Sequence, residues 1–352
     1  MKKIVFIVVS LSIFAVSAFG QNRVILESNG ISKVFGGSNA FQDAYEVAVN
    51  GDIIYLPGMQ FTPPAAIDKS ITLYGAGYHA DHTQATGLTK LTRNVLTIGV
   101  NAAGSHFEGI YFDGNVSFAN ARIDNVIIKR CYIGGNLTLN GLAEDFSENI
   151  KISENIITGS FNGIRTANLV FNNNIIINNT YDIFINLSNN AWIHNNIIVG
   201  RGLLVTSNWT SRFVIRNISG SLFENNIIYN THTSSYTFTE VSNNTFNNNV
   251  FSYDPTGDET NNWSDNFTGV TIEEMFENYT GHAYSFEADY KLVNPAIFIG
   301  TTGNQVGIYG GLQPFKANTR PSNPQIINKN IANSTNEEGK LEVEIEVEAQ
   351  NN

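Results

Sequence analysis

The chain contains a single cysteine, Cys131, so it cannot form a disulfide within itself. Basic residues are also scarce: 20 lysines and arginines stand against 31 aspartates and glutamates, for a formal net charge of −11. Binding of nucleic acid needs a basic face for the phosphates, so a nucleic-acid partner is disfavoured. Because a chain with one cysteine has no internal disulfide, its stability must come from a packed core.

Long apolar runs are missing as well, except at the N-terminus. Two lysines there precede the apolar run Ile4–Phe14, and the small residues Ala18 and Gly20 come just before Gln21. This order is typical of a secretory signal peptide, and the run is too short to span a membrane. We therefore predict a signal peptide over residues 1–20. A buried N-terminal strand is the alternative.

After this run, no segment approaches the roughly 18 unbroken apolar residues that a transmembrane helix needs. No cysteine stands at the expected cleavage site, which argues against a lipid anchor. We expect a secreted protein, located outside the cell, at its surface or in the periplasm. Removal of the two lysines would make the mature chain still more acidic.

An asparagine-rich pattern repeats through the middle of the chain at intervals of about 22 residues. We take the last asparagine of each repeat as a reference position. In the two repeats nearer the N-terminus, Cys131 and Gly109 are assigned to this position. The residues three before and two after it are mostly apolar, and the residue just before it is polar. Each unit thus predicts two short strands that meet at a polar corner. The reference asparagines are Asn155, Asn174, Asn196, Asn226 and Asn249.

This period and these short apolar segments are typical of one coil of a parallel β-helix. A leucine-rich repeat has a similar period, but its leucine framework is absent. Helical repeats need a periodicity of 3.6 residues, which these segments lack. The fold class that we predict is all-β, a right-handed parallel β-helix over residues 21–316.

At the reference position we expect a sharp bend in the left-handed backbone region, which asparagine tolerates better than most residues. Its side chain would point inward and bond to the coils above and below, which lie about 4.8 Å apart. Binding of calcium or sugar hydroxyls is the alternative role. A buried Cys131 would share the structural ladder, although a lone cysteine can also be a nucleophile. The predicted ladder comprises Cys131, Asn155, Asn174, Asn196, Asn226 and Asn249.

Both ends of a β-helix need a cap. At the N-terminal end we expect a short amphipathic helix, whose apolar face includes Phe41 and Ala44. At the other end, residues 317–352 form a tail with apolar and glutamate residues in alternation, which predicts a β-hairpin with a turn at Asn336–Gly339. The hairpin has three possible roles: to cap the C-terminal end, to dock a partner or to form a charged edge.

Two stretches resemble known proteins. GDIIYLPG followed by KSITLYGAGY is similar to the entrance of pectate-lyase-like β-helix proteins. ADYKLVNPAIFIGTTGNQVGIYGG, residues 288–311, resembles the closing coils of secreted right-handed β-helix proteins of Bacteroidota, with Asn294 where serine is usual. The resemblance implies a secreted β-helix whose shared motifs are structural, and many such proteins have no established activity.

Catalytic sets known for this fold are scarce in the sequence. The Asp-Asp and Gly-His-Gly sequences of its glycoside hydrolases are absent. A polysaccharide lyase would need an acidic calcium cluster beside a basic residue. The nearest approach is an expected outward column of alternating charge, which in the alternative is only a salt-bridged ladder. The weak candidates are Glu108, Arg130 and Glu154, with Lys129 and Lys151 beside them.

The histidines give little sign of a metal site. His79 and His82, with Asp81 between them, have a chelating composition, but no third ligand is identifiable, so we predict no metal. His106 falls in the expected inward column and is assigned to the core. His194 is expected to face outward.

Two interruptions of the repeat are candidates for ligand binding, because loops on a rigid solenoid carry function. The long interval between Asn196 and Asn226 contains an aromatic and cationic set that suits a sugar, and a second excursion contains a further tryptophan. In the alternative, each loop folds its aromatic residue onto the stem. The candidates are Trp209, Arg212, Arg216 and Trp263.

The favoured function is a non-catalytic exported β-helix that binds polysaccharide, or another cell-surface or extracellular component, or acts as a structural or adhesion protein. The alternative is a calcium-assisted polysaccharide lyase of the pectate-lyase-like superfamily, and calcium is the only cofactor that it implies.

Overall fold

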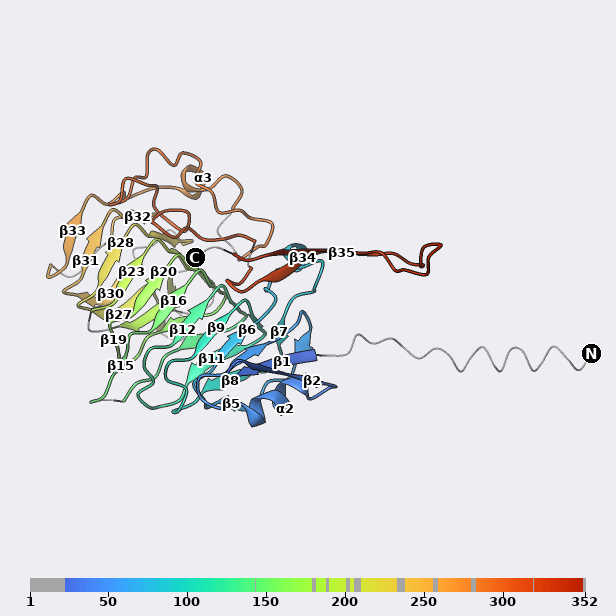
Figure 1. Ribbon diagram of the computed structural model, residues 1–352. Coiled ribbons are helices and arrows are strands. Elements are labelled where there is room, and N and C mark those ends of the chain that lie inside the picture. The colour runs from blue at the N-terminus through green and yellow to red at the C-terminus, as the bar shows by residue number, and fades with distance from the viewer. Residues whose placement is uncertain are drawn as a thin grey trace, which may run out of the picture.

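The computed structural model describes residues 23–350, apart from residues 143, 179–181, 188–189, 201–202, 206–209, 233–237, 256–258, 280–282 and 319. The predicted signal peptide lies outside the described residues. Figure 1 shows a parallel β-helix whose coils stack into three long sheets of 12, 9 and 8 strands, here called sheets A, B and C. The prediction of an all-β parallel β-helix is confirmed.

Sheet A begins with two antiparallel pairings among its first three strands and continues as a parallel ladder. In spatial order its strands are β2 (Ile31–Gly36), β1 (Arg23–Ser28), β3 (Ile53–Tyr55), β6 (Thr72–Tyr74), β9 (His106–Glu108), β12 (Ile127–Lys129), β16 (Lys151–Ser153), β20 (Val170–Asn172), β23 (Trp192–His194), β28 (Leu222–Glu224), β31 (Thr245–Asn247) and β33 (Asn262–Ser264).

Sheet B comprises β4 (Gln60–Phe61), β7 (Lys90–Leu91), β10 (Tyr111–Phe112), β13 (Tyr132–Ile133), β17 (Ile156–Ile157), β21 (Ile175–Asn178), β24 (Ile197–Gly200), β29 (Ile227–Asn230) and β32 (Val250–Phe251). Sheet C comprises β5 (Ala66–Ile67), β8 (Val95–Ile98), β11 (Asn115–Phe118), β14 (Leu137–Thr138), β18 (Phe161–Asn162), β22 (Phe184–Leu187), β27 (Ile215–Ser219) and β30 (Phe238–Ser242).

Smaller elements lie outside these sheets. They are the helices α2 (Ala40–Val47) and α3 (Ile272–Met275), the 3₁₀ turn η1 (Ala80–His82), the paired strands β15 (Ser147–Glu148) and β19 (Thr166–Ala167), the hairpin β25 (Leu203–Val205) and β26 (Thr210–Arg212), and the hairpin β34 (Gln325–Ile331) and β35 (Val343–Glu348).

The core fills the inside of the coils with stacked aliphatic and aromatic side chains. Phe171, Phe223 and Phe246 occupy the same inward place on successive parts of sheet A and are fully buried. The rings of Phe223 and Phe246 stack with centroids 4.8 Å apart. Identical neighbours in register pack well in a parallel stack, which explains why the coils repeat the same apolar positions.

A ladder of asparagine side chains runs through the corner between sheets A and B. The side chain of Asn196 shows the arrangement: its Oδ1 accepts bonds from the backbone and side chain of Asn174, and its Nδ2 donates to Oδ1 of Asn226 and to the carbonyl of Phe171. The same bonds join Asn155 to Asn174 and the later coils down to Asn249 and Asn266. The steps are 19, 22, 30, 23 and 17 residues long.

We expected the ladder asparagine to take the left-handed backbone conformation at each corner. Instead, the residue before it does so. Arg130, Glu154, Asn173 and Asn195 all have φ between 48° and 58°. Gly109, with φ of 73°, belongs to this column, because Tyr111 pairs with Tyr132 and the early register is therefore one residue different from the predicted one. Glycine and asparagine both suit the left-handed conformation. For this reason the sequence did not distinguish the ladder column from the column just before it.

The coils end earlier than the sequence indicates. The last strand of sheet A is β33, and residues 288–311, expected to form closing coils, contain none of the strands. Instead, the described residues of 270–325, called the return segment, run back over the outer face of sheet B and along the A–B corner (Figure 1). Ile175 and Ile177 of β21 face outward and are buried beneath it, while Ile176 faces the core.

The return segment bonds to the corner coil by coil. Asn248 donates to the carbonyl of Ile299, Asn225 to the hydroxyl of Thr301, Asn195 to the carbonyl of Gly307, and Asn173 to the carbonyl of Ile308. The column just before the ladder, predicted to face solvent, is consequently buried in its central part. The left-handed conformation aims these side chains away from the core, at the backbone of the return segment.

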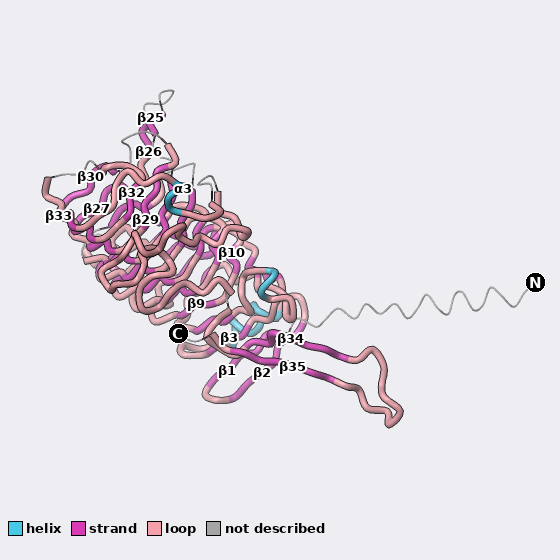
Figure 2. Tube along the Cα trace, turned by 90° about the horizontal axis from the view of Figure 1, so that it is seen from above, coloured by secondary structure: helices cyan, strands magenta, loops and turns pink. Residues whose placement is uncertain are grey.

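The two ends are closed differently. At the N-terminal end, the antiparallel strands β1 and β2 and helix α2 cover the first coil, and α2 buries Phe41 and Ala44 as expected. The C-terminal hairpin lies at this same end, beside β1 to β3 (Figure 2), and Gln325 reaches the carbonyl of Gly75. Its hairpin structure was predicted. It does not cap the opposite end, where Trp263 stacks on Phe246.

Cys131 should be chemically inert in the folded protein. Its side chain is fully buried in the ladder, and burial raises the pKa of its thiol well above the ordinary value. The reactive thiolate is therefore not formed near neutral pH. We expect no labelling by an aromatic disulfide reagent at pH 8 in native protein and one equivalent in urea. Rapid labelling of the native protein would contradict the buried position.

Candidate functional site

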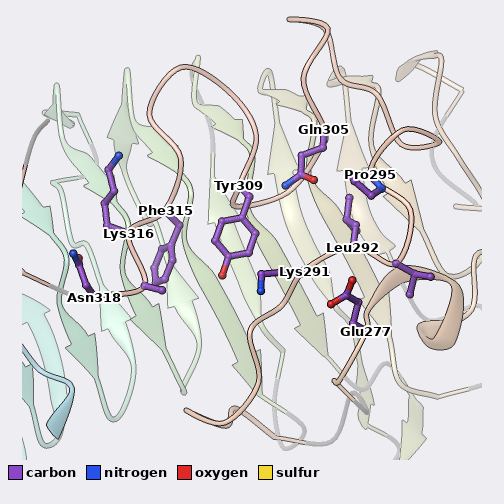
Figure 3. A pocket seen from close by; sticks show the side chains of 11 residues that line it. Glu277, Lys291, Leu292, Pro295, Gln305, Tyr309, Phe315, Lys316 and Asn318 are labelled. Atoms are coloured by element: carbon purple, nitrogen blue, oxygen red, sulfur yellow. The ribbon is translucent and has the colours of Figure 1, made fainter. Parts of the chain in front are cut away.

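Two open grooves of the molecule merit comparison as binding sites. The larger, about 660 Å³, is lined by residues of the return segment, and the side chains labelled in Figure 3 all belong to that segment. Its lysines flank a mainly apolar surface that includes Leu292 and Phe315, and Lys291 already pairs with Asp289 at 2.9 Å. This groove offers few polar groups that converge on one point.

The smaller groove, about 290 Å³, lies between the outer face of sheet A and the return segment. Its residues from sheet A belong to two columns of the register, which also contain Leu222 and Ser153 outside the groove. Lys151, Val170, Trp192 and Leu222 follow one another on successive strands, and the second column contains Ser153, Asn172, His194 and Glu224. Neighbouring strands are about 4.8 Å apart, so the side chains of each column stand next to one another. We call this the Trp192 groove.

Trp192 is held in a fixed orientation while much of its ring stays in solvent. Its indole is 44 % exposed, stacks on the imidazole of His194 at 4.0 Å and donates from Nε1 to Oε2 of Glu224 at 2.9 Å. Exposed Leu312 and Thr301 of the return segment face it across the groove. A large, oriented and exposed aromatic ring is suited to stacking against a ligand.

Asn172 supplies an unused hydrogen-bonding group at this groove. It is buried to 96 % (4 % exposed), and its Oδ1 has no partner in the described structure, although its Nδ2 donates to Asn173. An acceptor without a partner is costly unless water or a ligand satisfies it. The Trp192 groove therefore combines an aromatic platform with a polar group that needs a donor.

His194 is neutral at physiological pH. Burial lowers its pKa below the ordinary value of 6.5, and the hydrogen bond with Asn195 and the charge of Glu224 oppose this shift without cancelling it. A neutral imidazole has one donor and one acceptor nitrogen. With the amide of Asn172 and the carboxylate of Glu224, the groove can both donate to hydroxyl groups and accept from them.

Four of the predicted catalytic candidates, Glu108, Lys129, Arg130 and Glu154, lie elsewhere and are buried. Arg130 is 1 % exposed and bridges Glu108 at 3.2 Å and Glu154 at 3.0 Å, so the three form a salt-bridged ladder. Ser322 of the return segment donates to both carboxylate oxygens of Glu108. Pro321 packs so closely on Gly109 that a Cβ there would lie 3.1 Å away. These charges point outward from the coils as predicted, but the predicted exposure to solvent is wrong, because the return segment covers them.

The surroundings of these charges explain their pKa shifts. For Glu108, burial tends to raise the pKa, but hydrogen bonds from His106 and Ser322 and the charge of Lys129 outweigh it, and the pKa is lowered. For Lys129, burial and the charge of Arg130 lower the pKa, against the attraction of Glu154. Glu108, Lys129, Arg130 and Glu154 compensate one another's charges beneath the return segment. Lys151, by contrast, stands in the Trp192 groove.

The remaining candidates are scattered. Trp209 lies outside the described residues, and Arg212 is in β26, for which only the backbone is described. Arg216 is 46 % exposed and pairs with Asp182 at 2.9 Å. Trp263 is 37 % exposed, but its ring lies flat on Phe246 at 4.3 Å, as in the alternative in which the aromatic folds onto the stem. The structure does not bring Arg216 and Trp263 into one groove.

His106 is not in the core. Phe107 takes the inward place, and His106 points outward, 3.2 Å from Glu108. The rings of His79 and His82 are 4.6 Å apart. Within the described part of the chain, no three His, Cys, Asp or Glu side chains gather in a way that would hold a metal ion.

Sequence reasoning missed Trp192 and Asn172, although a signal was present. They lie four residues before Asn196 and two before Asn174, respectively, and these are the positions that face outward from sheet A. The ligand site was predicted in the loops, although the same register gives the outward positions of sheet A.

The chain was compared with models of known protein families, with curated proteins and with solved structures, and none of the three comparisons found a match. Among the described helices, none has the length and apolar character needed to cross a membrane.

Proposed function

We propose that the protein is an exported β-helix that binds polysaccharide through the Trp192 groove and does not cleave it. The observation that carries the proposal is the exposed, oriented ring of Trp192, flanked by Glu224, His194 and the unpartnered Oδ1 of Asn172. Aromatic faces stack on pyranose rings, while amides and carboxylates pair with sugar hydroxyls. The open side of the groove leaves room for a chain longer than one sugar.

The lyase alternative has weaker support. Its basic and acidic candidates, Arg130, Glu108 and Glu154, are paired with one another and covered by the return segment. A substrate would have to displace that segment to reach them. The position of this protein within the pectate-lyase-like superfamily, and its export, remain part of the proposal and rest on the sequence patterns.

Replacing Trp192 with alanine should weaken binding to a glycan array about tenfold or more, because an exposed aromatic anchor dominates such sites. Its thermal midpoint should change little, since the ring is half-exposed. The matched control is Trp263→Ala, a similarly exposed tryptophan outside the groove, which should leave glycan binding unchanged. Unchanged glycan binding by Trp192→Ala would remove the groove from the proposal.

A second measurement addresses cleavage. The wild-type protein is incubated with uronic-acid and neutral glycans in the presence of calcium, and unsaturated product is followed by ultraviolet absorbance. We expect none. Formation of product would establish a lyase, and its loss in Arg130→Lys would point to the buried ladder as the site.

A further inference from the structure

A small cavity of about 190 Å³ lies under the return segment, away from the Trp192 groove. Its floor is the outer face of sheet B, at Ile156 and Ile175. The loop around η1 and the return segment form its walls, which are mostly aromatic. The rings that line it are Tyr78, Tyr284, Phe286, Tyr290, Tyr309 and Phe315.

These rings are fixed by their mutual packing. Tyr284 stacks parallel to Tyr290 at 5.8 Å and meets Phe286 edge-on at 5.0 Å. Behind them, Tyr132 stacks on Phe286 at 5.5 Å and on Tyr111 at 4.4 Å. The cavity wall is thus formed before any ligand arrives, which lowers the entropic cost of binding.

One buried polar group at this cavity is unsatisfied. Tyr78 is 1 % exposed, and its hydroxyl has no hydrogen-bond partner among the described residues. A buried hydroxyl without a partner costs free energy, so the position favours an occupant that bonds to it. The cavity exceeds the roughly 150 Å³ that accommodates benzene, so it has room for more than one water molecule.

The charge around the cavity is negative. Glu287 and Asp289 line it, and Asp289 is paired with Lys291 at 2.9 Å, so Glu287 is the negative group left for a ligand. No lysine or arginine is among the described residues that line the cavity. His79 carries little positive charge at neutral pH, because burial and then the neighbouring His82 lower its pKa. The faces of aromatic rings are also electron-rich and attract cations.

We propose that this cavity binds a small organic ammonium group of the choline class. The methyl groups would contact the rings, the cationic centre would be balanced by Glu287, and a hydroxyl on the ligand would satisfy Tyr78. Phe286 and Glu287 are exposed, so the ligand can enter from solvent at that side. The proposal is independent of polysaccharide binding in the Trp192 groove.

The test is titration calorimetry of the mature protein with choline chloride, with its uncharged isostere 3,3-dimethylbutan-1-ol, and with glucose. We expect saturable binding of choline and at least about tenfold weaker binding of the isostere, because only choline has the cation–π term. Equal binding of the isostere, preferential binding of glucose, or no binding of choline would each overturn the proposal.

Two variants locate the site without removing a core ring. Glu287 is exposed, so Glu287→Gln should leave the thermal midpoint unchanged. It should weaken the binding of choline severalfold. Tyr78→Phe should weaken the binding of choline, because it removes the hydroxyl that would bond to the ligand. The thermal midpoint should stay the same or rise, since that hydroxyl is unsatisfied in the free protein. Trp192→Ala, outside the cavity, should leave choline affinity unchanged. Full choline affinity in both cavity variants would place the ligand elsewhere.

Discussion

Replacing Arg130 with alanine is expected to lower the free energy of unfolding by about 3 to 5 kcal/mol. The substitution leaves the carboxylates of Glu108 and Glu154, which are 0 % and 3 % exposed, without their shared cation. It also removes the bond from the guanidinium to the carbonyl of Arg320 in the return segment. The corner and the segment that covers it should therefore loosen together.

Urea denaturation followed by circular dichroism measures this effect. The matched control is Arg216→Ala, which breaks the exposed bond to Asp182 and should cost about 0 to 1 kcal/mol. Both variants replace an arginine by alanine on a β-helix coil, and the two sites differ in burial, in pairing and in the left-handed backbone of Arg130. Equal losses in the two variants would mean that the buried ion ladder contributes no more than a surface pair.

Replacing Asn196 with alanine should cost about 3 kcal/mol or more, since several buried groups lose their partners at once. The change removes the acceptor of two bonds from Asn174 and the donor to Asn226 and Phe171. These groups are buried in the corner, where water cannot easily replace the lost bonds. The loss should exceed that of a typical surface substitution severalfold.

The same urea titration gives the comparison for this ladder. Asn162→Ala also removes an amide ladder contact, to Asn186, but on a half-buried strand of sheet C. Its expected cost is about 0.5 kcal/mol. A cost for Asn196→Ala as small as that of the control would show that the internal ladder is not a major source of stability.

The stack of coils was predictable because its apolar positions recur at a regular interval along the sequence. The apolar places of Ile152, Phe171 and Ile193 recur at the same distance before each ladder asparagine, and strands in parallel register keep identical residues in contact. Ladder asparagines and the buried Cys131 follow from the same register. A two-residue periodicity likewise indicated the C-terminal hairpin.

The position of the return segment over the coils was not predictable from that repeat. Residues 288–311 were expected to be coils, and the corner column with Asn173 and Asn195 to face water. The period of a coil tells which side chains leave the core, but it does not tell whether a distant segment lies over them. The outward isoleucines Ile175 and Ile177 carried this information, because two apolar residues on the outer face of a strand need a covering layer.

The candidate site shows the same limit. The outward register of Trp192 and Asn172 was contained in the sequence, but the groove also needs Thr301 and Leu312, which come from the return segment. The aromatic cavity likewise joins Tyr78 to Tyr284, more than two hundred residues later in the chain. Such pairings are made by tertiary folding and leave no local pattern.

The return segment also changes the way in which this solenoid should unfold. In most repeat proteins each unit touches only its neighbours, so the ends can fray while the centre stays folded. Here Ser322 bonds to Glu108 across 214 residues and Gln325 to Gly75 across 250. A segment that ties the first coils to the last adds a free-energy cost to partial unfolding at both ends. It links the stack into one cooperative unit, which can close only after Ser322 and Gln325 have been made.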